Sequence, residues 1–149
     1  MSNRSLKVDL HVHSKYSKRP SAWILRKIGC QESYVEPEIL YNIAKNRGMD
    51  LVTITDHNTL SGSLEIAHLS DTFVSEEITT YFPEDQCKLH VLAWNITERQ
   101  HDDVTHLREN VFELVSYLNN EKIIHAVAHP MYSLNDRLKD YVMSSFCIK

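Results

Sequence analysis

Nine of the 149 residues are histidines, and five of them recur where the chain also places acidic residues or ends an apolar run. Together with the neighbouring acids, the candidate ligands are His11, His13, Asp56, His57, Glu76, Glu77, His90 and His129. Neutral imidazole nitrogens and carboxylate oxygens are ligands that divalent zinc, manganese and iron accept. These side chains therefore predict a metal centre built from histidine and carboxylate, without thiolates.

The number of candidate ligands allows for more than one ion. A carboxylate in such a set can bridge two metal ions a few ångströms apart. A paired site can generate hydroxide near neutral pH and can stabilise both oxygens of a displacement at phosphorus. The chemistry indicated is hydrolysis, most naturally of a phosphate ester.

Each signal has an ordinary structural explanation when it is taken alone. A single His-x-His on a strand is a weak sign of metal binding. His90 could be a core histidine, and His129 could simply end a strand before a proline. One of the adjacent acids Glu76 and Glu77 is expected to be solvated. Only the joint occurrence of these signals favours the metal centre.

The remaining histidines are expected to lie away from this centre. His68, His101 and His106 fall in helical or loop stretches, so we expect them on the surface. His125 lies deeper in its strand than His129, and a core position is expected for it.

The secondary structure must bring the candidate ligands together. Residues 7–13 alternate between apolar and polar, the period of a strand, which places His11 and His13 on one face. Residues 51–55 are a β-branched run that ends in a polar string, as a buried strand entering a loop does. The other expected elements are strands over 72–80, 88–94 and 123–130, and helices over 37–48, 63–69 and, as one long helix, 100–120.

Strands that alternate with helices predict an α/β fold with a mainly parallel sheet of about five strands and right-handed crossovers. The candidate ligands are expected at one end of these strands. In α/β folds the carboxyl ends of the strands carry the site, because the loops there vary while the sheet holds their anchor points. The sequence therefore predicts a single shared pocket.

The composition is that of an ordinary globular protein, with 42% hydrophobic residues, 24% charged residues and a formal net charge of −4. The negative charge disfavours a protein that holds nucleic acid mainly through a basic surface. Cys30, Cys87 and Cys147 are widely spaced and odd in number, which predicts reduced thiols. No apolar run is long enough for a secretory leader or a membrane span. We therefore expect a cytoplasmic protein that does not bind membranes.

Four motifs occur in a fixed order along the chain. They are DLHVHS at 9–14, ITDHNTLSG at 54–62, SEEIT at 75–79 with KLHVLAW at 88–94, and AHP at 128–130. In this order they resemble the PHP family, named for its polymerase and histidinol phosphatase members. The resemblance spans residues 7 to about 132, so we expect one PHP-like domain over 1–149. It implies a distorted TIM-like βα barrel with two or three metal ions at its C-terminal mouth, acting on phosphomonoesters or phosphodiesters.

The resemblance also implies roles for individual residues. The metal ligands would be His11 and His13 on one ion, His90 and His129 on a second, Glu77 bridging the two, and His57 on a third ion or its water. The catalytic residues would be His57, Glu77 and Asp56, with Asp56 or Asp9 orienting a ligand from behind. The ions would be zinc, manganese or iron, and the substrate a phosphorylated small molecule or nucleotide.

Two positions depart from the family pattern. Many members have an aspartate shortly after the His-x-His motif, where this chain has Lys18. Lys18 and Arg19 could instead contact a substrate phosphate, or they could belong to a solvated loop. Family members usually have glycine before the glutamate pair, and Ser75 stands there in this chain.

The length is a larger departure, because a closed barrel usually takes ~250 residues. The chain could be the N-terminal part of a longer product, a natural short variant, or a remnant that keeps the fold without the activity. The alternative function is accordingly a weakly active or inactive metal-binding module with a structural or regulatory role. An incomplete barrel leaves an open sheet edge, which a homodimer or a missing C-terminal segment would cover.

Overall fold

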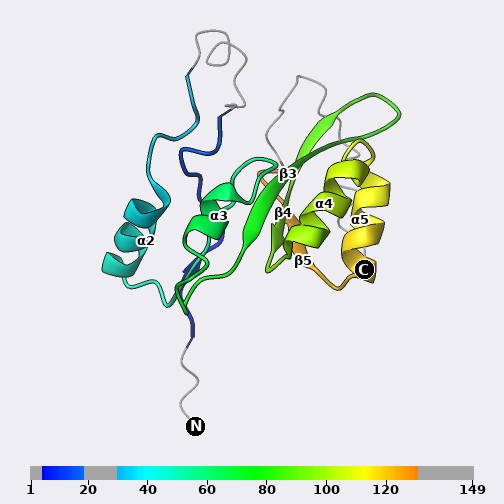
Figure 1. Cartoon of the computed structure of the whole chain (residues 1–149). Helices are drawn as coiled ribbons and strands as arrows, with labels where there is room; N and C mark the ends of the chain where they lie inside the picture. Colours follow the sequence, from blue (N-terminus) through cyan, green and yellow to red (C-terminus); the bar gives the residue numbers. More distant parts are fainter. Residues whose placement is uncertain (1–4, 19–29, 131–149) are drawn as a thin grey trace.

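The computed structural model describes residues 5–18 and 30–130, which form a mixed α/β arrangement with two sheets and four helices (Figure 1). The strands are β1 Val8–Asp9, β2 Leu51–Val52, β3 Ser75–Tyr81, β4 Lys88–Trp94 and β5 Ile124–Val127. The helices are α2 Pro37–Asn46, α3 Ser61–Glu65, α4 Glu98–Leu107 and α5 Val111–Asn120. The expected strands and the helix over 37–48 are present, although β1 and β2 are much shorter than predicted.

The first sheet is a short parallel pair of β1 and β2, with Val8 opposite Leu51. A small apolar cluster lies under it, in which Ile54 and Ile66 are buried and Leu40 of α2 packs against them. Proline at its first turn suits the start of α2, since that position needs no backbone donor. This half of the structure holds the two loops that leave β1 and β2.

The second sheet has the order β3-β4-β5, and both of its pairings are antiparallel. The prediction of a mainly parallel sheet is therefore wrong. A short turn over 82–87 joins β3 to β4, and a connection of that length can only produce a hairpin. Parallel neighbours would need a crossover of a dozen residues or more.

The long helix expected over 100–120 is two helices, α4 and α5, which is a second correction. Asn110 breaks it, because its side chain accepts a hydrogen bond from the Phe112 backbone at 3.0 Å and caps α5. The helices run antiparallel, since Tyr117 of α5 donates to Asp103 of α4 at 2.7 Å, while Arg99 near the start of α4 pairs with Glu121 at the end of α5. An even number of helices returns the chain so that β5 runs antiparallel to β4.

The two faces of β3 and β4 have different partners. Ile78, Val91 and Ala93 lie in one apolar cluster with Val104 of α4 and Leu114 of α5, and these helices lie beside the sheet in Figure 1. Because side chains alternate along a strand, the intervening residues of β3 and β4 face the other way. That opposite face carries the candidate metal ligands.

The two sheets and four helices of the described residues confirm a mixed α/β fold. Residues 5–18 and 30–130 show no closed barrel, so the barrel stays a prediction. Within this part of the chain β5 is an edge of its sheet, and the expected covering partner also stays a prediction. No helix in the described ranges has the length and apolar character that a bilayer span requires.

Candidate metal centre

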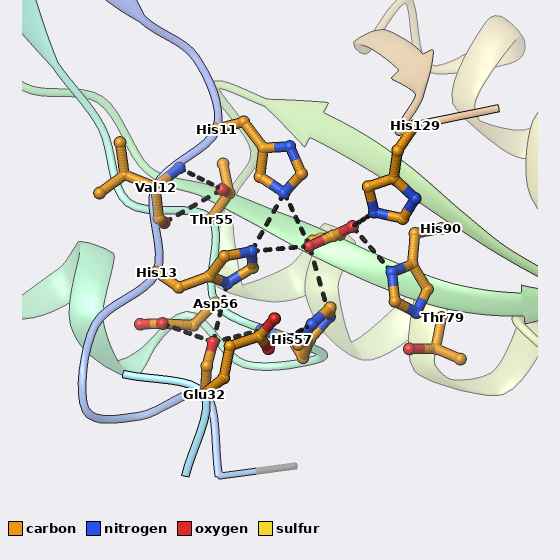
Figure 2. Close-up of polar contacts among 12 residues, drawn as sticks. His11, Val12, His13, Glu32, Thr55, Asp56, His57, Thr79, His90 and His129 are labelled. Atoms are coloured by element: carbon orange, nitrogen blue, oxygen red, sulfur yellow. Dashed lines mark hydrogen bonds and ion pairs between the residues drawn. The ribbon is translucent and has the colours of Figure 1, made fainter. Parts of the chain in front are cut away.

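Five imidazoles surround one buried carboxylate, that of Glu77 on β3 (Figure 2). Oε2 of Glu77 lies 3.0 Å from Nε2 of His11, 3.0 Å from Nε2 of His13 and 3.4 Å from Nδ1 of His57. Its Oε1 lies 2.8 Å from Nδ1 of His90 and 3.1 Å from Nε2 of His129. Each carboxylate oxygen therefore has its own set of imidazoles, which is the arrangement that a bridging carboxylate needs.

Four separate segments deliver the histidines to Glu77. His90 lies within β4, directly opposite Thr79 of β3, so the antiparallel register places it beside the glutamate. It lies in mid-strand, whereas the sequence predicted a strand end. His57 follows β2, and its backbone forms an isolated bridge to Glu77 itself. His129 follows β5 with a positive φ of 31°, so the backbone leaves the extended conformation of the strand at this residue.

The segment with His11 and His13 is held by Thr55, which lies in the loop after β2. Val12 donates its backbone N–H to Oγ1 of Thr55 at 3.0 Å, and Thr55 donates its own N–H to the Val12 carbonyl at 2.7 Å. These reciprocal bonds replace the strand pairing that stops at Asp9. Residue alternation then directs both neighbouring imidazoles to the same side.

Asp56 lies behind the centre rather than in contact with the ligand atoms. Its carboxylate is buried and accepts hydrogen bonds from the Ser14 backbone at 2.7 Å, from Ser14 Oγ at 2.6 Å and from Ser17 Oγ at 2.8 Å. Ser17 Oγ in turn lies 2.9 Å from Nδ1 of His13. Asp56 therefore orients His13 through a serine, as a positioning residue.

The close fit around Asp56 requires a glycine at position 62 of α3. A Cβ atom there would lie 2.1 Å from Oδ2 of Asp56 and 2.5 Å from Oγ of Ser14. Real Cβ atoms do not approach other heavy atoms so closely. Gly62 thus lets α3 pack directly on the carboxylate that holds the His-x-His loop.

The donor atoms of the centre fit a cation better than they fit one another. Nε2 of His11 lies 3.0 Å from Nε2 of His13. At that distance two neutral imidazoles cannot both direct an N–H toward each other. Nδ1 of His57 and Nδ1 of His90 are buried without a hydrogen-bond partner, although each faces Glu77. Buried polar atoms of this kind need a ligand to satisfy them.

Two groups of three residues have ligand atoms within 4.8 Å of one another. They are His11, Glu77 and His129, and His13, His57 and Glu77. The first group contains both His11 and His129, although His11 contacts Oε2 of Glu77 and His129 contacts Oε1. Grouping the histidines by mutual distance therefore gives a different division from grouping them by the carboxylate oxygen that they contact. Glu77 belongs to both groups under either division, so it is the shared ligand.

The electrostatics of the centre favour an ionised glutamate. Burial alone would raise the pKa of Glu77, but hydrogen bonds with His11, His129 and His13 hold that pKa well below its usual range. Burial lowers the pKa of His90 to about 4, although Glu77 opposes the effect. Burial would also lower the pKa of His13, but the contact with Glu77 outweighs it, and the net pKa is raised. His90 is therefore already neutral near pH 7, as a metal ligand must be.

Glu32 is a further residue of the site that the sequence did not reveal. Its Oε2 lies 2.7 Å from Nε2 of His57, and the side chain is 25% exposed. Burial would raise the pKa of Glu32, but the hydrogen bond with His57 lowers it overall. Glu32 comes from a loop without periodicity, distant from any of the four motifs, so only the folded structure could identify it.

Glu76 and His101 correct two expectations. Neither residue of the Glu76–Glu77 pair is solvated, because both side chains are buried. Glu76 points to the helix side of β3, where its Oε1 lies 2.9 Å from Nδ1 of His101 on α4. Burial raises the pKa of Glu76, and the hydrogen bond with Glu76 raises the pKa of His101. The pair lies on the opposite side of the sheet from the metal centre, and His101 is half-buried, with a side chain that is 23% exposed.

The predicted substrate-binding residues are less closely connected with the centre. Lys18 is exposed and donates its backbone N–H to the Tyr16 carbonyl at 2.9 Å. Arg19 lies outside the described residues. Lys15 in the same loop forms an ion pair with Glu36.

Comparison with known proteins gives limited similarities. No family model matches the chain. An uncharacterized protein of Methanocaldococcus jannaschii is 38% identical over 73 residues, which are 49% of this chain and 41% of that protein, less than half its length. The crystal structure of a candidate metal-dependent phosphoesterase from Bifidobacterium adolescentis aligns at a TM-score of 0.45 and 21% identity. That alignment covers 80% of this chain and 34% of the other.

Proposed function

We propose that this protein is a metal-dependent phosphoesterase of PHP type, which hydrolyses a phosphomonoester or phosphodiester by metal-activated water. The observation that carries the proposal is the division of the Glu77 carboxylate, whose Oε2 faces His11 and His13 and whose Oε1 faces His90 and His129. A carboxylate placed in this way can bridge two divalent ions.

The number of ligands on each side of Glu77 favours catalysis at Oε1. Catalytic zinc sites typically have three protein ligands, whereas structural sites have a closed set of four. Among the described residues, His90, His129 and Glu77 make a set of three on the Oε1 side. This side therefore leaves room for water or substrate.

Divalent zinc, manganese or iron ions held here would supply Lewis-acid chemistry, by polarising a phosphoryl oxygen and by lowering the pKa of water. The residues of the chain orient the ligands. Ser17 and Asp56 fix the ring of His13, and Thr55 fixes the backbone between His11 and His13. In this proposal Glu32 and His57 hold or move a proton at the edge of the centre, across their 2.7 Å contact. The cationic side chains of Lys18 and Arg19 attract the substrate phosphate. The proposed location of the protein is the cytoplasm.

Hydrolysis of an aryl phosphate by the purified full chain tests this proposal. The protein is assayed with added manganese or zinc as wild type, Glu77→Ala, His11→Ala and His68→Ala. His68 is exposed and serves as the matched histidine control. We expect Glu77→Ala and His11→Ala to lose at least about 100-fold in rate, while His68→Ala keeps the wild-type rate. Equal rates in all four proteins would contradict the proposal.

A second candidate function is that of a metal-binding module with a structural or regulatory role. The observation that favours it is the ligand set on the Oε2 side, since His11, His13, His57 and Glu77 together make four. A closed set of four is typical of a structural ion. Tight metal binding without hydrolysis of any phosphomonoester or phosphodiester would support this function over the first.

A further inference from the structure

A cavity of about 150 Å³ lies directly beside the metal centre. Among the described residues it is lined by His57, Asn58, Thr79, Tyr81, Lys88, His90, Arg108 and Glu109. Two of these, His57 and His90, also face Glu77. The cavity therefore shares a wall with the centre, and its other walls contain residues that the metal site does not use.

The sheet register builds the main wall of the cavity. Thr79 pairs with His90, and Tyr81 pairs with Lys88, so these four side chains lie in two adjacent rows on the ligand-bearing face. Asn58 closes one end through two hydrogen bonds to Thr79, 3.0 Å at its Oγ1 and 2.8 Å at its backbone N–H. This part of the wall is thus held in place without a ligand.

One donor in the wall has no partner. Nε2 of His90 is buried without a hydrogen bond, and the residue is 2% exposed. Because Nδ1 of the same ring faces the Glu77 carboxylate, Nε2 carries the proton when Nδ1 acts as a ligand. A buried N–H of this kind requires an acceptor, and the residue His90 is among those that line the cavity.

The cavity also has a positive electrostatic character. The ammonium of Lys88 is close enough to His90 to lower the pKa of that imidazole, after the larger effect of burial. Arg108, the C-cap residue of α4, also lines the cavity. Glu109 is the one carboxylate among the described lining residues, and it is exposed. Two cationic side chains, those of Lys88 and Arg108, therefore line the cavity, together with one exposed carboxylate among its described lining residues.

We propose that this cavity binds a second anionic group of the substrate, a carboxylate or a second phosphate, through Arg108 and Lys88. The inference rests on the proposed function, since the first phosphate would occupy the metal centre. Arg108 provides a planar set of donors that matches either anion, and charge-assisted hydrogen bonds to it are stronger than neutral ones. The shared wall places the two anionic groups on one small molecule, which makes Arg108 a specificity-determining residue.

Binding of short phosphonates, which are not hydrolysed, tests this inference without any turnover. Isothermal titration calorimetry on the metal-loaded full chain compares alkylphosphonates of two to four carbons with the matching ω-carboxylates and ω-diphosphonates. The two arms distinguish a carboxylate from a second phosphate. The variants are Arg108→Gln and Arg99→Gln, and Arg99 is the matched control because it lies on the same helix with a side chain that is 77% exposed.

We expect the best bifunctional phosphonate to bind the wild type at least about tenfold more tightly than the plain one of equal length. Arg108→Gln should abolish that gain and keep the affinity for the plain phosphonate, while Arg99→Gln should keep both. Equal affinities in the wild type, or a gain that survives Arg108→Gln, would overturn the inference. A protein that binds phosphonates in this pattern without hydrolysing phosphate esters would contradict the proposed function alone.

Discussion

Nδ1 of His13 lies 2.9 Å from Oγ of Ser17, and this contact determines which nitrogen of the imidazole is available to a metal ion. Ser17 donates its hydroxyl hydrogen to Asp56 at 2.8 Å, so its oxygen accepts a hydrogen bond from Nδ1–H of His13. The proton then resides on Nδ1, and Nε2 presents its lone pair toward His11 and Glu77. Partners of this kind fix the tautomer and the ring orientation of metal ligands.

Replacement of the serine should weaken metal binding without removing a ligand. We expect Ser17→Ala to lower the zinc affinity by about 10–100-fold, because His13 loses the partner that orients it. A competition titration with a chromophoric chelator measures the affinity. Ser70→Ala, at an exposed serine, is the control and should bind as the wild type does. A zinc affinity of Ser17→Ala equal to that of the control would refute this role.

Alanine at position 62 should destabilise the fold, although alanine is normally the better helix former by about 1 kcal/mol. The added Cβ would lie 2.1 Å from Oδ2 of Asp56, which forces the helix or the carboxylate to move. We expect the free energy of unfolding to fall by about 2 kcal/mol in Gly62→Ala. Urea denaturation measures it, with the neighbouring Ser61→Ala as the control. A Gly62→Ala protein more stable than the wild type would show that the packing tolerates the methyl group.

Removal of His101 should lower the free energy of unfolding, because Glu76 on the helix side of the sheet loses its partner. Glu76 is buried and pairs with His101, so His101→Ala leaves the carboxyl without that hydrogen bond. We expect a loss of about 2 kcal/mol in the free energy of unfolding. His106→Ala, an exposed histidine on the same helix, should change it by less than about 0.5 kcal/mol. Equal stabilities of the two variants would mean that the Glu76–His101 contact does not stabilise the fold.

Metal binding should strengthen as the pH rises. Burial opposes protonation of His13, but Glu77 outweighs it and raises the pKa of His13 above its ordinary value of 6.5. A metal ion binds only the neutral imidazole, so below this pKa the ion that binds His13 must displace a proton, and the affinity for that ion falls about tenfold per pH unit. His90, with a pKa of about 4, contributes no such proton above pH 5.5.

Calorimetry at pH 6 in two buffers of different ionisation enthalpy measures the protons released on metal binding. We expect about one proton from the His13 side, and we expect its release to disappear in His13→Gln. A zinc affinity that stays constant from pH 5.5 to 7.5 would contradict the raised pKa of His13.

Local patterns in the sequence were sufficient to predict several elements. The period-2 alternation around His11 and His13 correctly predicts that both imidazoles share a face, and 88–94 forms β4 with the predicted bounds. The helix over 37–48 is present as α2 because a proline start and an amphipathic stripe are properties of the segment itself. Such features depend on neighbours a few residues away.

Features that depend on distant contacts could not be predicted in this way. The apolar stripe of 100–120 continues through the break, since Val104 and Val111 are both buried in spite of the cap at Asn110. That break turns β5 antiparallel to β4. The contacts of Glu32 with His57 and of Glu76 with His101 join residues 25 apart, which no periodicity records.

The number of metal ions bound per chain tests the bridging role of Glu77 most directly. Inductively coupled plasma mass spectrometry after zinc loading and gel filtration measures it in wild type, His129→Ala, Glu77→Ala and the control His68→Ala. We predict about two ions in the wild type and the control, about one in His129→Ala, and none in Glu77→Ala, because each Glu77 oxygen faces one set of imidazoles. Retention of both ions in Glu77→Ala, or the absence of bound metal in the wild type, would contradict the account.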